Sequence, residues 1–78
     1  MKLVFRKSYA YLLFSEGADW YLTYFTGGPF EVDICVKLSQ QEITRVSGNQ
    51  TELEKLIVEF KANPSLFDGR RIIPSVTG

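Results

Sequence analysis

The sequence has no histidine and only one cysteine among its 78 residues, and these two scarcities exclude several kinds of chemistry. A structural zinc site takes four cysteine or histidine ligands, and a nucleophilic cysteine usually needs a histidine as its base. An internal disulfide needs two cysteines, so a reducing compartment is expected. The sequence therefore predicts a protein that is not an enzyme and that holds neither a metal nor a cofactor.

Long hydrophobic runs and a net charge are also absent. No stretch approaches the roughly 18 apolar residues of a membrane span, and Arg6 and Lys7 interrupt the N-terminal segment, which disfavours a signal peptide. The nine basic and nine acidic residues cancel, so no global charge favours nucleic acid or an anionic membrane. We expect a single domain, residues 1–78, in the cytoplasm.

Segments rich in aromatic and β-branched residues predict strands in the first half of the chain. Connectors of four or five residues between them favour an antiparallel meander over parallel crossovers. Residues 26–29 (TGGP) are interpreted as one of these connections. A phosphate-binding loop leads into a helix and is followed by a lysine, whereas these glycines lie between two predicted strands and no such lysine follows them. The predicted strands are residues 3–6, 9–14, 20–25 and 30–37, with residues 70–73 as a last short candidate.

Two helices are predicted in the second half. Ser39 and Glu42 have the spacing of a capping box at the start of a short helix. Asn49 is the expected N-cap of a longer helix, which ends before Pro64. The longer helix has an apolar stripe of Leu53, Leu56, Ile57 and Phe60 and a predicted ion pair between Lys55 and Glu59.

The fold class implied is α+β: an antiparallel sheet of three to five strands, with one short and one longer helix packed on one face. The covered face should take the more aliphatic set of each strand, such as Leu12 and Phe14. The other face stays open, although a shift of register by one residue would exchange the two sets. The residues expected on the open face are Tyr9, Tyr11, Tyr21, Thr23, Glu31, Asp33 and Cys35.

Strict alternation places the cysteine, Cys35, on the charged side of its strand. Lys37 would favour its thiolate and Asp33 would oppose it, and no histidine can act as base. We interpret Cys35 as a small residue on a semi-buried face, covered by another element or by a partner. Glu31 and Asp33 lack a predicted pocket for acid–base work, and the acidic residues lack the spacing of a calcium loop.

The charges are unevenly distributed along the chain. Residues 8–36 contain four carboxylates and no lysine or arginine, together with many aromatic residues. Aromatic side chains amid carboxylates are typical of a surface that binds a basic protein, whereas nucleic-acid binding needs aromatics interleaved with cations. The predicted partner-binding residues are Tyr9, Tyr11, Glu16, Asp19, Tyr21, Glu31 and Asp33.

With GGPFEVDICVKLSQQEI in its middle, this short chain resembles the small bacterial immunity proteins that neutralise toxins of contact-dependent inhibition and related secretion systems. The resemblance is one of general type and covers most of the chain. It implies a cytoplasmic inhibitor of a basic toxin domain, acting through Glu16, Asp19, Glu31 and Asp33. The alternative is a small structural or assembly module that forms a homodimer through the same face.

Overall fold

The computed structural model describes residues 1–26 and 32–75 and has the predicted α+β architecture. The five strands lie in the sheet in their sequence order, and each is antiparallel to its neighbour, which confirms the meander. The elements are β1 (Lys2–Lys7), β2 (Tyr11–Glu16), β3 (Asp19–Phe25), β4 (Asp33–Lys37), α1 (Gln40–Val46), α2 (Gln50–Ala62), the 3-10 helix η1 (Pro64–Phe67) and β5 (Arg71–Ile72).

Both helices begin where the sequence predicted. The Ser39 hydroxyl accepts a hydrogen bond from the Glu42 amide at 3.3 Å, and the Glu42 carboxylate accepts one from the Ser39 amide at 2.8 Å. This is a complete capping box, which satisfies two backbone donors of α1. The Asn49 side chain accepts from the Glu52 amide at 3.1 Å and caps α2 with this single bond.

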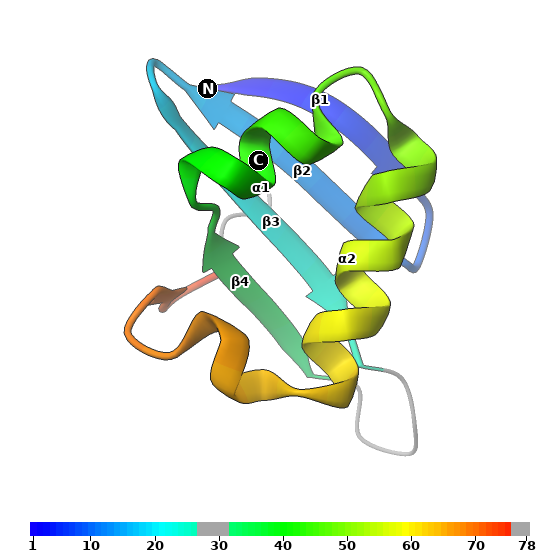
Figure 1. Cartoon of the computed structure of the whole chain (residues 1–78), viewed down its shortest axis with the longest axis vertical. Helices are drawn as coiled ribbons and strands as arrows, with labels where there is room; N and C mark the ends of the chain where they lie inside the picture. Colours follow the sequence, from blue (N-terminus) through cyan, green and yellow to red (C-terminus); the bar gives the residue numbers. More distant parts are fainter. Residues whose placement is uncertain (27–31, 76–78) are drawn as a thin grey trace.

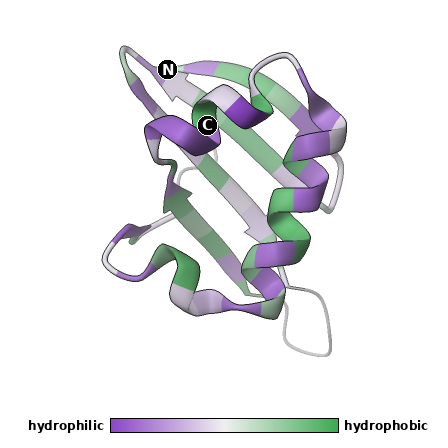
Figure 2. Cartoon of the chain, in the orientation of Figure 1, coloured by the Kyte–Doolittle hydropathy of each residue, from purple (hydrophilic) through white to green (hydrophobic). Residues whose placement is uncertain are grey.

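The helices lie on one face of the sheet and make a two-layer structure (Figure 1). Along its turns α2 alternates between hydrophobic and hydrophilic segments (Figure 2), as a helix with one buried side must. All four residues of the predicted stripe are buried in the core. Phe67 joins them, with its ring edge-on to Phe60 at 5.3 Å, whereas the neighbouring Leu66 is exposed.

The predicted facing of β3 is confirmed and that of β2 is wrong. Leu22 and Tyr24 of β3 are buried against the helices, as expected. On β2, however, the core takes Tyr11 and Leu13, and Phe14 lies on the opposite side of the sheet. The reason is chemical, because polar groups of α2 satisfy the Tyr11 hydroxyl and a buried tyrosine is then inexpensive.

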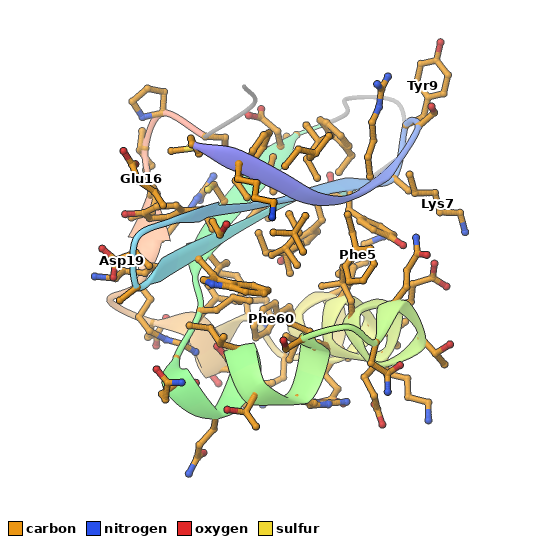
Figure 3. The ribbon with its side chains drawn as sticks, turned by 90° about the horizontal axis from the view of Figure 1, so that it is seen from above. Phe5, Lys7, Tyr9, Glu16, Asp19 and Phe60 are labelled. Atoms are coloured by element: carbon orange, nitrogen blue, oxygen red, sulfur yellow. The ribbon has the colours of Figure 1, made fainter. Side chains whose placement is uncertain are left out.

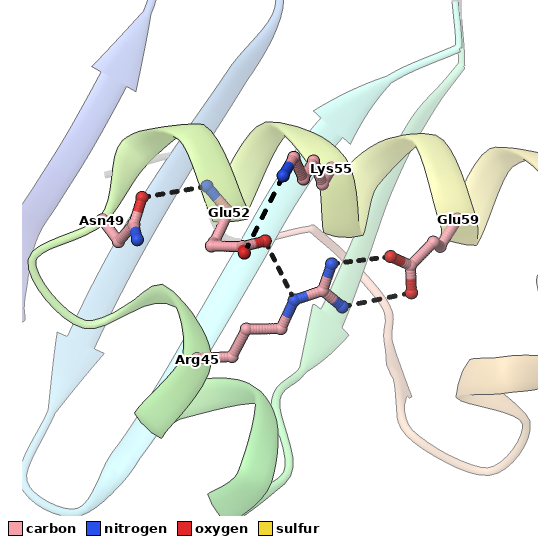
Figure 4. Close-up of polar contacts among 5 residues, drawn as sticks. All are labelled: Arg45, Asn49, Glu52, Lys55 and Glu59. Carbon is pink, nitrogen blue, oxygen red and sulfur yellow. Dashed lines mark hydrogen bonds and ion pairs between the residues drawn. The ribbon is translucent and has the colours of Figure 1, made fainter.

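Ion pairs connect the two helices to each other. The two terminal nitrogens of the Arg45 guanidinium on α1 donate to the two carboxylate oxygens of Glu59, at 3.1 and 2.6 Å. Its Nε donates to the Glu52 carboxylate at 3.4 Å (Figure 4). The predicted pair of Lys55 with Glu59 does not form, because Arg45 holds Glu59 and Lys55 lies 3.9 Å from Glu52. The forked guanidinium matches a carboxylate better than a single ammonium can.

Candidate functional site

The side of the sheet away from the helices, called here the helix-free face, is the surface on which the sequence placed its binding residues. The cross-strand register assigns side chains to it, because directly opposite residues share a face. Its members are Leu3, Arg6, Leu12, Phe14, Glu16, Asp19, Tyr21, Thr23, Phe25, Asp33, Cys35, Lys37 and Ile72.

The centre of the helix-free face is not accessible. Phe14 is only 6% exposed, and Thr23 and Cys35 are fully buried. Cys35 lies between Thr23 on β3 and Ile72 on β5, so its position on a covered part of this face is confirmed. A partner can therefore reach only the two ends of the face and the side that β1 borders.

One end of the face, at the turn from β2 to β3, is acidic. Glu16 and Asp19 stand directly opposite each other across this turn, an arrangement in which like charges repel. The Lys37 ammonium lies 3.5 Å from the Asp19 carboxylate and offsets part of this repulsion. Glu16 is exposed and forms no ion pair with any described residue, and the half-buried Tyr21 lies one residue pair further along the face.

The carboxylates do not form the single patch that the sequence predicted. Asp33 pairs with Phe25 at the far end of the sheet, separated from Glu16 by the length of β2, about 17 Å at roughly 3.4 Å per residue. Arg6 and Lys37 also lie on this face and offset its negative charge. Glu31 falls outside the described residues.

The placement of Tyr11 on the open face is wrong. Its hydroxyl donates to the Glu54 carboxylate at 2.8 Å and accepts from the Gln50 amide at 2.7 Å, both on α2. Burial raises the pKa of Tyr11 above 10.0, the bond from Gln50 lowers it, and the Glu54 carboxylate raises it again. Tyr11 therefore joins β2 to α2 and is 3% exposed, too little to meet a partner.

Tyr9 differs from the other predicted site residues in its backbone. It occupies the third position of the turn that the Ala10 amide closes by donating to the Lys7 carbonyl at 3.0 Å. Its φ is 61°, in the left-handed region that bulky residues avoid, and glycine or asparagine is preferred at such a position. The other described residues with positive φ are glycines, namely Gly17, Gly48 and Gly69.

The Tyr9 side chain makes no compensating contact with the core. It is 93% exposed. Figure 3 shows it projecting beyond the ribbon, at the end of the sheet opposite Glu16 and Asp19. A left-handed conformation costs a residue of this kind about 1–2 kcal/mol, and burial does not repay that cost here.

A hollow of about 270 Å³ lies beside Tyr9. Phe25 is fixed next to it, because its amide donates to the Ala10 carbonyl at 3.1 Å. None of the described residues that line the hollow is acidic. They are Arg6, Lys7, Ser8, Tyr9, Tyr11, Leu12 and Phe25.

Sequence reasoning found Tyr9 but missed Arg6, Leu12 and Phe25 beside it. The turn contains no glycine or proline, so the predicted strand began at residue 9 and hid the loop. An irregularity between Leu3 and Phe5 in β1 also shifts the facing of Arg6. The one available sign was the basic pair at residues 6–7 directly before Ser8 and Tyr9.

Within residues 1–26 and 32–75, histidine, cysteine, aspartate and glutamate nowhere gather in a group of three that could hold a metal ion. No helix among these residues has the length and apolar character needed to cross a membrane. The chain matches no protein-family model, and neither curated proteins nor solved structures give a significant match. Its function is therefore inferred from geometry and charge.

Proposed function

We propose that this chain is a small protein-binding domain and that its partner docks on the accessible ends of the helix-free face. Tyr9 carries the proposal, because it is a strained tyrosine that is 93% exposed. Backbone strain that the fold does not compensate indicates a role outside the fold. Tyrosine is also one of the residues that most often dominate protein–protein binding, because it offers a large rigid surface with a polar tip.

An inhibitor that blocks another protein is the form of binding that the resemblance to immunity proteins favours. In this form the acidic end of the face meets a basic group of a toxin domain. Glu16 is better placed for this than Asp19, because Asp19 already has Lys37 at 3.5 Å. Glu16 is exposed and has no such partner among the described residues. An unpaired charge at the rim of an interface mainly raises the rate of association.

Native mass spectrometry of the chain alone and after co-expression with the product of its neighbouring gene tests the proposal. We expect a monomer alone and a 1:1 complex on co-expression. Tyr9→Ser and Glu16→Lys should each weaken the complex, and Lys61→Glu on α2 is the matched control that should not. The proposal is contradicted if the chain stays monomeric when it is co-expressed with the neighbouring gene product. It is also contradicted if neither substitution weakens the complex.

Self-association through the same face is the second candidate, and the charge order of the face favours it. Arg6 lies towards the end that holds Tyr9, and Glu16 lies at the other end. A two-fold axis would place Arg6 of one copy opposite Glu16 of the next, which is the condition for a closed dimer. Arg6→Glu and Glu16→Lys should each abolish such a dimer, and the double variant should restore it.

Pairing of sheet edges is a poor route to either complex. The edge strand β1 carries the cations Lys2, Arg6 and Lys7 on its two faces, and its register is irregular between Leu3 and Phe5. Positive side chains and bulges are features that protect an edge strand from pairing with another chain. At the other edge β5 has only two residues. The accessible ends of the helix-free face therefore suit a partner better than either edge of the sheet.

A further inference from the structure

We infer that the hollow beside Tyr9 binds an acidic segment of the partner, with a carboxylate at Arg6 and an apolar side chain against the neighbouring rings. This inference rests on the proposed function and specifies the chemistry of the group that docks there. It differs from the sequence-based expectation, in which the chain itself supplies the negative charge. The two ends of the helix-free face then accept groups of opposite charge.

The charge of the hollow comes mainly from Arg6. The two cations that line the hollow are engaged differently. The Lys7 ammonium lies 3.7 Å from the Glu54 carboxylate on the helix side of the sheet, so its charge is partly neutralised. Arg6 points to the other side, opposite Leu12, and forms no ion pair with any described carboxylate. An exposed guanidinium without a partner is suited to bidentate binding of a carboxylate.

The apolar part of the hollow comes from Leu12 and Phe25, both half-buried on the helix-free face. Tyr9 stands at its border as an exposed ring. A pocket with aromatic and aliphatic walls and one arginine that has no ion pair among the described residues has the composition of an interface hot spot. A volume of about 270 Å³ lies slightly below the range of roughly 300–1,000 Å³ for small-molecule sites, which favours side chains of a partner over a separate small molecule as the occupant.

Nuclear magnetic resonance of the labelled full chain tests the inference. The probe is a short blocked peptide that alternates glutamate with leucine and phenylalanine, and the control peptide has lysine in place of glutamate. We expect the acidic peptide alone to shift the amide signals of Ser8, Tyr9 and Ala10. Arg6→Glu should weaken binding about tenfold, equivalent to about 1.4 kcal/mol, whereas Lys61→Glu should leave it unchanged.

Three results would overturn the inference. The first is an acidic peptide that leaves these amide signals in place. The second is equal binding by the Arg6→Glu variant. The third is a short oligothymidylate that shifts the same signals at lower concentration than the peptide, since phosphates also bind arginine and bases also stack on tyrosine. A native complex that tolerates Arg6→Glu refutes this inference alone, whereas failure of any complex to form refutes the proposed function.

Discussion

The guanidinium of Arg70 donates two hydrogen bonds, of 2.6 and 3.2 Å, to the carboxylate of Glu42. The same guanidinium donates to the carbonyls of Lys37 at 3.1 Å and of Leu66 at 2.7 Å. Glu42 in turn accepts from the amide of Ser39. One side chain near the C-terminus therefore fixes the start of α1, the end of β4 and η1.

Arg70→Ala should lower the free energy of unfolding by about 2–4 kcal/mol, because it leaves a carboxylate and two carbonyls without their donor. The side chains of Arg70 and Glu42 are 28% and 16% exposed, so water replaces the lost bonds only in part. Urea denaturation measures the effect. Arg71→Ala is the control and should cost far less, because Arg71 forms no ion pair with any residue that the structure describes. Equal costs for the two variants would refute the role assigned to Arg70.

The same pair predicts a loss of stability in acid. Burial raises the pKa of Glu42, but the hydrogen bonds from Arg70 and from the Ser39 amide lower it by more than burial raises it. The net pKa therefore lies below 4.5. A carboxyl group whose pKa is depressed in the folded state stabilises the fold at every pH above its pKa in the unfolded chain. This stabilisation is lost as the pH falls through the folded-state pKa. The urea midpoint should therefore be steady near neutrality and decline below about pH 4.5. Glu42→Gln should flatten this decline, and an unchanged slope would contradict the assignment.

Leu56→Ala should cost about 2–5 kcal/mol of stability, as the removal of a core leucine does elsewhere. Leu56 is 3% exposed and belongs to the core. Val58→Ala, two residues along the same helix, is the matched control, since Val58 is 65% exposed. Alanine is the better helix former, so this control should be neutral or slightly stabilising. Thermal unfolding followed by circular dichroism compares them, and similar shifts in both variants would refute the assigned packing of α2.

Tyr9→Gly should stabilise the fold by about 0.5–1 kcal/mol while weakening binding, because glycine adopts the left-handed conformation freely. Gly17 has the same φ of 61° in the turn after β2. Gly17→Ala should therefore have the opposite effect and destabilise the chain by a similar amount. Chemical denaturation of the two variants checks the signs. A destabilised Tyr9→Gly variant would mean that the tyrosine serves the fold, which removes the main support for a binding role.

Local sequence rules predicted the helices well, because their start signals act over three or four residues. Ser39 with Glu42 and Asn49 with Glu52 cap helices as their spacing requires. The apolar stripe of α2 is equally local, since its period alone defines the buried side. The ion-pair partners of α2 are not set locally. Glu59 binds Arg45, which is fourteen residues away, rather than Lys55, which is one turn away.

The candidate site was predicted less well, because facing in a sheet depends on long-range contacts. Tyr11 looked suited to a surface until the polar groups of α2 were placed against its hydroxyl. Because side chains alternate along a strand, assigning one residue of β2 to the wrong face assigns all its side chains to the wrong faces. Tyr9 was chosen for its chemistry, but its positive φ depends on a turn that carries no glycine to announce it.

The order of elements also matters for the newly made chain. The apolar side of β2 and β3 is completed by α2, whose last core residue, Phe60, follows the end of β4 by 23 positions. At roughly 5–20 residues per second, synthesis of this stretch takes about one to five seconds, during which the nascent hairpins lack their cover. The cations and the irregular register of β1, which disfavour pairing of an exposed strand with another chain, are already present during this interval.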